Sequence, residues 1–337
     1  MKDETRRLRS MVTGAGRRNI LKLFGAGLCV VAAAGPVQAD DYPSKPIRVL
    51  IPFPAGGSSD IVTRLVTKKM GEQTGWNFVP ENKPGAGGNL TFEIASQAEP
   101  DGYTVLFSTP GIVINPHLYR RVPYQWDDFV PVGLIGEAPL VLMVNPKLPI
   151  KSIADLQALT RQKPQSIKFA SSGNGSSSHL AMDVLRTMGD VSYLHIPYRG
   201  GAPAMIDSIS GVVDMTMLPI SESLPNIRAG RLLALGQTGS SRSPIAPEIP
   251  TIEEGGVKDY SVTTWYVVLA PKKTPPAVVK TFHAALETAL KDAGLQKELE
   301  QAGVQVINGG PKEAAAFMKK QYGQWEKAIA ASGTKLE

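Results

Sequence analysis

Glycine- and serine-rich turns follow apolar segments at several points of this chain, and a helical pattern begins directly after each turn. A helix start presents unpaired backbone N–H groups and the positive end of the helix dipole, and glycine lets a ligand come close to that backbone. Such a turn predicts a site for a small anion such as a carboxylate. In the first turn, the candidate contacts are Phe53, Ala55, Gly56, Gly57, Ser58, Ser59 and Asp60.

Asp60 has two possible roles in this turn, because its carboxylate could shape the loop or could receive an amino group of the ligand.

Similar turns occur at 85–89, 171–179 and 198–203. Ordinary turn chemistry also explains glycine and serine at such places, so the anion site and a purely structural turn both remain open. The further candidate contacts are Gly87, Ser172, Gly173, Ser176, Ser178, His179, Tyr198, Gly200 and Gly201.

Strands and helices are expected to alternate at short intervals, which predicts parallel βαβ units and an α/β fold. The expected strands are 47–51, 76–80, 103–107, 139–145, 166–170, 193–197, 213–218, 232–236, 260–270 and 304–307. The expected helices are 59–73, 89–98, 153–161, one behind each of the turns at 171–179 and 198–203, then 277–292, 295–302 and 313–331. Residues 239–259 are rich in Ser, Pro and Gly and predict a surface connection.

Enzyme signatures are weak in this sequence. Residues 175–179 (GSSSH) depart at their last position from the Gly-x-Ser-x-Gly pattern of a hydrolase nucleophile. His117, His179, His195 and His283 have no metal-ligand spacing, and we expect His195 to be structural and His179 to contact a ligand or cap a turn. No acid–base pair stands near a candidate nucleophile, and no nucleotide-binding loop is recognisable. We therefore expect neither an enzyme nor a metal or other cofactor.

The N-terminal residues 1–39 predict a secretory signal with cleavage near Ala39, and the pair Arg17-Arg18 favours twin-arginine over Sec export. The chain would then be periplasmic. The net charge of +6 lies mostly in that segment, which holds seven Lys/Arg and two Asp/Glu, so no basic surface suggests nucleic acid. Cys29, the single cysteine, lies there as well, so the expected mature chain has no disulfide.

A set of short motifs resembles the Bug-type periplasmic solute receptors of tripartite tricarboxylate transporters. These motifs are 42–48 (YPSKPIR), 52–60 (PFPAGGSSD), 82–88 (NKPGAGG), 100–104 (PDGYT) and 198–204 (YRGGAPA), with Gly211, Asp214 and the strand around Trp265. The resemblance implies a two-domain periplasmic-binding-protein (Venus flytrap) fold, in which each domain is a largely parallel sheet flanked by helices. The implied domains are 43–141 with 262–337, and 142–261.

The resemblance also implies a function. Family members bind a small carboxylate, often a dicarboxylate, in the interdomain cleft. Residues 53–60 would hold one end, while 171–179 and 198–202 would read the other, with Ser108 and Thr109 close by and Trp265 over the apolar body. The implied partner is a two-component membrane permease, and the protein would be a monomer. Two alternatives stay open: an exported hydrolase of an anionic ester, and a carboxylate sensor for a membrane kinase.

Overall fold

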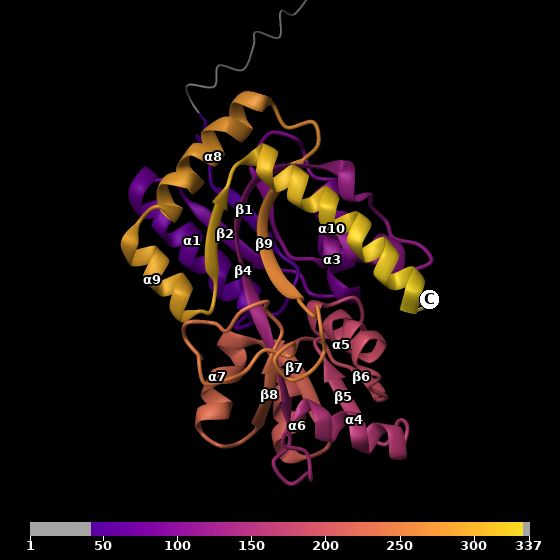
Figure 1. Cartoon of the computed structure of the whole chain (residues 1–337). Helices are drawn as coiled ribbons and strands as arrows, with labels where there is room; N and C mark the ends of the chain where they lie inside the picture. Colours follow the sequence, from indigo (N-terminus) through magenta and orange to yellow (C-terminus); the bar gives the residue numbers. More distant parts are fainter. Residues whose placement is uncertain (1–41, 333–337) are drawn as a thin grey trace, which may run out of the picture. The chain divides into compact units, whose positions relative to one another are not determined.

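The computed structural model describes residues 42–332, and the expected signal segment lies outside them (Figure 1). All described residues belong to one compact unit. The strands are β1 (Ile47–Ile51), β2 (Phe78–Asn82), β3 (Thr104–Ser108), β4 (Phe129–Val144), β5 (Lys168–Ser171), β6 (Leu194–Pro197), β7 (Met215–Pro219), β8 (Leu233–Gln237), β9 (Thr263–Pro271) and β10 (Gln305–Gly309).

Helices follow most strands, as βαβ units require. They are α1 (Ser58–Thr74), α2 (Asn89–Ser96), α3 (Gly111–Leu118), α4 (Ile153–Gln162), α5 (Ser177–Gly189), α6 (Gly201–Ser210), α7 (Ile220–Arg228), α8 (Pro276–Leu290), α9 (Ala293–Gln301) and α10 (Pro311–Ser332), with short 3₁₀ turns η2 (Ala86–Gly88) and η3 (Trp126–Asp128). Among the residues 42–332, no helix is long and apolar enough to cross a membrane.

The long strand β4 belongs to two groups of strands. From Phe129 to Pro139 it pairs antiparallel with β9, and from Leu140 to Val144 it pairs antiparallel with β7. The first group has the order β2-β1-β3-β9-β4-β10, and the second has the order β8-β4-β7-β5-β6. Figure 1 shows β4 running from one group into the other. The strand therefore changes partners between Pro139 and Leu140.

The pairing is mixed, whereas the sequence favours largely parallel sheets. Parallel ladders join β1 to β2 and β3, and β5 to β6 and β7. Every ladder that involves β4 or β9 is antiparallel. The α/β class is as expected. The antiparallel ladders join β4 to β7, β8, β9 and β10, and β9 to β3, and among the described strands β4 alone takes part in both groups.

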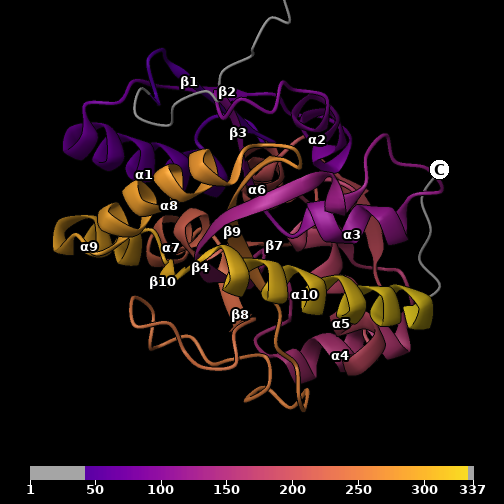
Figure 2. The ribbon, with the colours of Figure 1, turned by 90° about the horizontal axis from the view of Figure 1, so that it is seen from above.

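Apolar clusters lie on both faces of the first group of strands. One joins the strands to α1, α8 and α9, through side chains such as Val66, Phe282 and Leu299. Figure 2 shows these three helices gathered on one side and α3 and α10 on the other. A second cluster includes Leu118 of α3, Trp325 of α10, Leu180 of α5 and Met217 of β7.

Three elements differ from the sequence prediction. β4 begins ten residues earlier than expected, at Phe129, although Pro131, Gly133 and Gly136 interrupt its β pattern. The helices α3 and α7 were not expected; each contains an internal proline, Pro116 and Pro225 respectively. A proline inside a helix removes a backbone hydrogen bond, so its sequence pattern argues against a helix.

Candidate ligand-binding site

A small cavity of about 60 Å³ lies where the turns after several strands meet. Its walls come from the carboxyl ends of β1, β3, β5, β6 and β7, from the N-termini of α1, α5, α6 and α7, and from β4 and β9. Ligands of open α/β sheets bind at this edge of the strands. The lining residues are Phe53, Pro54, Ala55, Gly57, Ser58, Ser59, Thr109, Leu140, Ser172, Ser176, Ser177, Ser178, Gly200, Gly201, Ala202, Pro203, Pro219, Glu222 and Thr264.

The N-terminus of α1 has no side-chain cap of its own, and Asp60 holds the loop that precedes it. Gly57 is the N-cap residue and no side chain caps the helix from that position. Asp60, which is 4% exposed, instead accepts a hydrogen bond from the backbone N–H of Gly56 at 2.9 Å. Its other oxygen accepts from Arg64 Nε at 2.8 Å and from Asn82 Nδ2 at 3.1 Å. Of its two possible roles, Asp60 fills the loop-shaping one, and it does not line the cavity.

The α5 start supplies hydroxyl groups to the cavity. Ser176 is its N-cap, and its Oγ accepts from the backbone N–H of His179 at 3.3 Å. Ser177 Oγ donates to Thr264 Oγ1 at 3.2 Å. Ser178 is 2% exposed, and its Oγ is buried without a hydrogen-bond partner. A buried polar group normally has a partner, so this hydroxyl is suited to meet a ligand.

The α6 start lies against the loop that follows β1. Gly200 has a φ of +117°, and an added Cβ there would come 3.0 Å from Cγ of Pro54. Its backbone N–H donates to Ser172 O at 3.1 Å, which ties the α6 start to the turn after β5. Tyr198 does not line the cavity; its hydroxyl donates to Asp207 Oδ2 at 2.6 Å.

Two stacked histidines, which do not line the cavity, contact the turn after β5. The rings of His179 and His195 lie 4.2 Å apart with an angle of 8° between their planes. His195 Nε2 lies 2.7 Å from Ser171 Oγ, and His179 Nδ1 accepts from the backbone N–H of Gly175 at 3.3 Å. Burial lowers the pKa of both rings, and burial together with the neighbouring His179 lowers the pKa of His195 to about 3. The charge of Asp183 acts in the opposite direction and raises both pKa values.

This pair predicts a loss of stability in acid. An exposed histidine in the unfolded chain has a pKa of about 6.5, so below that pH the unfolded state binds a proton that folded His195 refuses. The stability that neutral His195 provides is complete above about pH 6.5 and is lost progressively as the pH falls toward 3. Between about pH 7 and about pH 5 we expect the free energy of unfolding to fall by about 2 kcal/mol from this residue.

Urea unfolding of the wild type and of His195→Gln at both pH values measures this effect. Titrating groups that do not contact His195 contribute equally to both proteins, so the difference between their pH slopes reports His195 together with the stacked His179. Equal slopes would show that His195 is not held neutral by the fold.

Glu222 is the acidic residue in the cavity wall, and it is not among the contacts predicted from the sequence. It lies in the first turn of α7, and its Oε1 accepts a hydrogen bond from the backbone N–H of Ser58 at 2.8 Å. Burial raises the pKa of this carboxyl, while the hydrogen bond from Ser58 acts in the opposite direction. Because Pro225 argues against a helix at this place, the sequence gives no signal that Glu222 faces a site.

The structure brings many of the predicted contacts together and leaves others apart. Those that line the cavity are Phe53, Ala55, Gly57, Ser58, Ser59, Thr109, Ser172, Ser176, Ser178, Gly200 and Gly201. Those that do not line it are Gly56, Asp60, Gly87, Ser108, Gly173, His179, Tyr198 and Trp265. Lining residues absent from the prediction include Leu140, Ser177, Pro219, Glu222 and Thr264.

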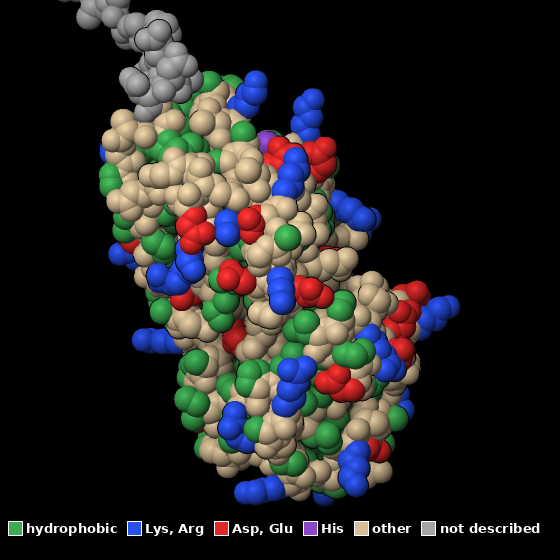
Figure 3. Space-filling model, turned by 90° about the vertical axis from the view of Figure 1, so that its left-hand side faces the viewer, with side chains coloured by type: hydrophobic (Ala, Val, Ile, Leu, Met, Phe, Trp, Pro, Cys, Tyr) green, Lys and Arg blue, Asp and Glu red, His purple; other side chains and the backbone are tan. Residues whose placement is uncertain are grey.

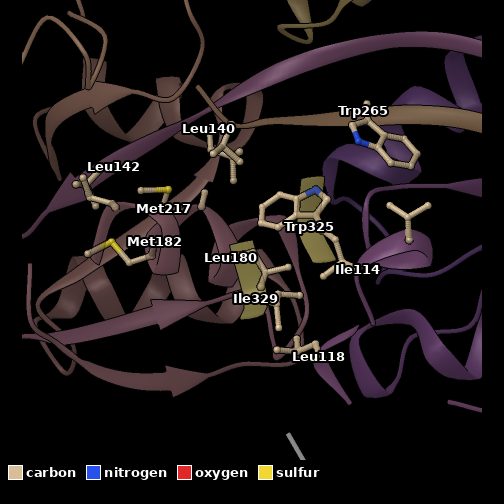
Figure 4. Close-up of a cluster of buried hydrophobic side chains, with 14 of the residues drawn as sticks. Ile114, Leu118, Leu140, Leu142, Leu180, Met182, Met217, Trp265, Trp325 and Ile329 are labelled. Atoms are coloured by element: carbon tan, nitrogen blue, oxygen red, sulfur yellow. The ribbon is translucent and has the colours of Figure 1, made fainter. Parts of the chain in front are cut away.

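Trp265 lies in the apolar core and not at the cavity. It is 1% exposed, and its ring meets Phe317 of α10 edge-on at 5.5 Å between ring centroids. Figure 4 shows Trp265 in the same buried cluster as Ile114 and Trp325. Strand alternation explains this placement, because the neighbouring Thr264 points the opposite way, toward the cavity.

The face drawn in Figure 3 has no large area of positive or negative side chains. Lys/Arg and Asp/Glu are interspersed there, without a continuous area of one sign. Within residues 42–332, no group of three His, Cys, Asp or Glu is placed to hold a metal ion. No Lys or Arg of the described chain lines the cavity, so the donors that it offers to an anion are helix starts and hydroxyl groups.

Comparisons with known proteins agree on one family. Residues 62–334 match the family described as "Tripartite tricarboxylate transporter family receptor". The "UPF0065 protein in tcbD-tcbE intergenic region" of Pseudomonas sp. (strain P51) is 38% identical over 319 residues, which are 93% of this chain and 94% of that protein.

Two solved structures are similar over nearly the whole described chain. "R. palustris Rpa4515 with adipate" has a TM-score of 0.84 and 32% identity, and covers 88% of this chain and 100% of its own. "Structure of periplasmic binding protein BugD" has a TM-score of 0.83, with the same identity and coverage. These likenesses confirm the expected periplasmic-binding-protein fold.

Proposed function

The chain belongs to the receptor family of the tripartite tricarboxylate transporters, which is a family of transport receptors and not of enzymes, and we propose that it captures a small organic acid in the cavity between the starts of α1, α5 and α6. The ligand is held and released unchanged. The proposal keeps the expected periplasmic location, with removal of residues 1–39, and delivery to a two-component membrane permease.

The observation that carries the proposal is the convergence of helix starts and hydroxyl groups on one small cavity. The N-termini of α1, α5 and α6 all contribute to its wall, and Ser178 adds a buried hydroxyl without a partner. Each hydrogen bond to a carboxylate is worth about 1.5–3 kcal/mol. A few such bonds suffice for micromolar binding, which corresponds to about −8 kcal/mol.

Capture by closure of two domains follows from the two groups of strands. We assign 43–141 with 262–337 to one domain and 142–261 to the other, because β4 changes partners between Pro139 and Leu140 and β9 begins at Thr263. Cavity residues come from both segments, for example Ser58 and Ser178. An acid that contacts both binds the closed form better, which is the condition for a ligand to shift the protein toward closure.

The similar structure that contains adipate makes dicarboxylates the first class to test. A thermal-shift screen of the purified protein against mono- and dicarboxylic acids of three to six carbons is the decisive experiment. An acid at about 100 times its Kd stabilises the folded state by about 2.7 kcal/mol, which raises the melting temperature measurably. A folded protein whose melting temperature responds to none of these acids at millimolar concentration would contradict the proposal.

Ser178→Ala tests the site itself. We expect about a tenfold loss of affinity for the acid that binds best, because a hydrogen bond of about 1.4 kcal/mol or more to the ligand disappears. The matched control is Ser166→Ala, an exposed serine outside the cavity, which leaves the affinity unchanged. Calorimetry measures both, and equal affinities for the two variants would remove Ser178 from the site.

A further inference from the structure

A carboxylate of the protein itself occupies the α1 start. Since Gly57 offers no side-chain cap, the backbone N–H of Ser58 donates instead to Glu222 Oε1 at 2.8 Å. Glu222 comes from α7, on the other side of the predicted domain boundary. An incoming ligand carboxylate would be held by the same N–H group, so Glu222 fills a place that this fold otherwise offers to an anion.

The second oxygen of Glu222 faces another helix start. A Cβ added at Gly201, the first residue of α6, would come 2.2 Å from Glu222 Oε2. The glycine is therefore needed for the carboxylate to lie where it does. The Glu222 side chain is thus wedged between the starts of α1 and α6, both of which line the cavity.

The part of the cavity wall near the start of α5 offers hydrogen-bond donors and carries no carboxylate. Its polar groups are hydroxyls, from Ser172, Ser176 and Ser178, with Thr109 and Thr264 nearby, and no acidic residue other than Glu222 lines the cavity. Ser178 Oγ is buried there without a partner. One region of the wall therefore suits a ligand carboxylate, and the region around Glu222 suits a hydrogen-bond donor.

We propose that Glu222 sets the ligand class: the receptor prefers a small monocarboxylic acid that carries a hydroxyl or ammonium group at its other end over the dicarboxylic acid of the same length. This inference rests on the proposed function and names the substrate class of the same cavity. A second ligand carboxylate would meet Glu222, and two carboxylates that share a site cannot both ionise without a large cost. A hydroxyl or ammonium group instead donates to Glu222.

The test uses ligands that differ only at one end. Calorimetry at neutral pH compares succinate, 4-hydroxybutyrate and 4-aminobutyrate, and then the equivalent sets with three, five and six carbons, on the purified wild type. At the chain length that binds best, we expect the hydroxy or amino acid to bind at least about tenfold more tightly than the diacid. The hydroxy and amino members separate the two donor types.

Glu222→Gln removes the charge and keeps the shape of the side chain. We expect it to bind the diacid at least about tenfold more tightly than the wild type does, and to bind the amino acid more weakly. The matched control is Glu248→Gln, since Glu248 is exposed and does not line the cavity. This control should rank the diacid, the hydroxy acid and the amino acid by affinity in the same order as the wild type does.

The outcomes separate the two proposals. A wild type that binds the diacid as tightly as its hydroxy and amino partners overturns the role of Glu222 and leaves the receptor function intact. So does a Glu222→Gln variant whose ligand order is unchanged. If neither the wild type nor Glu222→Gln binds any acid while both remain folded, the proposed function fails. If Glu222→Gln does not fold, the ligand order of the wild type alone decides.

Discussion

Replacing Asp60 by alanine is expected to lower the affinity for the acid that binds best by about 100-fold, and the free energy of unfolding by about 2–4 kcal/mol. Asp60 is 4% exposed and accepts hydrogen bonds from Gly56, Arg64 and Asn82. Its removal leaves donors without an acceptor at the base of the α1 start. The loop would lose the geometry in which its residues form part of the cavity wall.

Two further variants make this result interpretable. Asp60→Asn keeps the shape and one oxygen acceptor, so its losses of affinity and stability should be intermediate. Asp127→Ala removes an exposed carboxylate that pairs with Lys272 at 3.4 Å, and exposed ion pairs contribute little, about 0–1 kcal/mol. Urea unfolding and calorimetry on all three variants test the expectation. An Asp60→Ala protein that keeps its affinity would show that the loop needs no such support.

The second large effect is expected at Gly87, where an alanine should weaken binding by about 30- to 100-fold. Gly87 lies outside the cavity, in the loop before α2, but a Cβ there would come 2.3 Å from the backbone oxygen of Asn174. Tyr119, at the end of α3, contacts the same atom, because its hydroxyl donates to Asn174 O at 3.2 Å. In our proposal Gly87 and Asn174 belong to different domains, so the methyl group opposes closure.

The φ of Gly87, +64°, would be strained for alanine in the open form as well as the closed form. Gly230→Ala controls for this cost, because Gly230 has a φ of +67° and a Cβ there would meet nothing within 4 Å. Both variants should lose a similar amount of stability, measured by urea unfolding without ligand. The loss of binding should be confined to Gly87→Ala, and equal affinities in the two variants would refute the closing contact.

The helix starts of the site could be predicted from sequence because their signals are local. A glycine and serine turn between an apolar strand and an amphipathic helix is legible within about a dozen residues. This is how Ser58, Ser178 and Gly201 were found, and all three line the cavity. The α/β class followed from the same alternation of strands and helices.

The features that the sequence did not reveal depend on distant partners. Glu222 contacts Ser58 across 164 residues, and it lies on a helix whose internal Pro225 conceals it. The contact of His195 with Ser171 spans 24 residues and two strands, so spacing along the chain gives no sign of it. The sequence predicts Trp265 over the apolar body of a ligand and Tyr198 as a ligand contact, yet the first packs in the core and the hydroxyl of the second donates to Asp207. An aromatic residue beside a site motif does not reveal which side of its strand it faces.

The pairing of β9 has a consequence for the order in which the molecule can assemble. During synthesis β1, β3 and β4 emerge early, but β3 and the first part of β4 find their shared neighbour only when β9 arrives, after β5 to β8 have been made. The last part of β4, from Leu140 to Val144, and the strands β5 to β8 pair with one another without it. The segment from the end of β4 to β8 can thus form its strand pairs before β3 and the first part of β4 pair with β9. A nascent chain halted before Thr263 would expose the unpaired edge of β3 to chaperones or to aggregation.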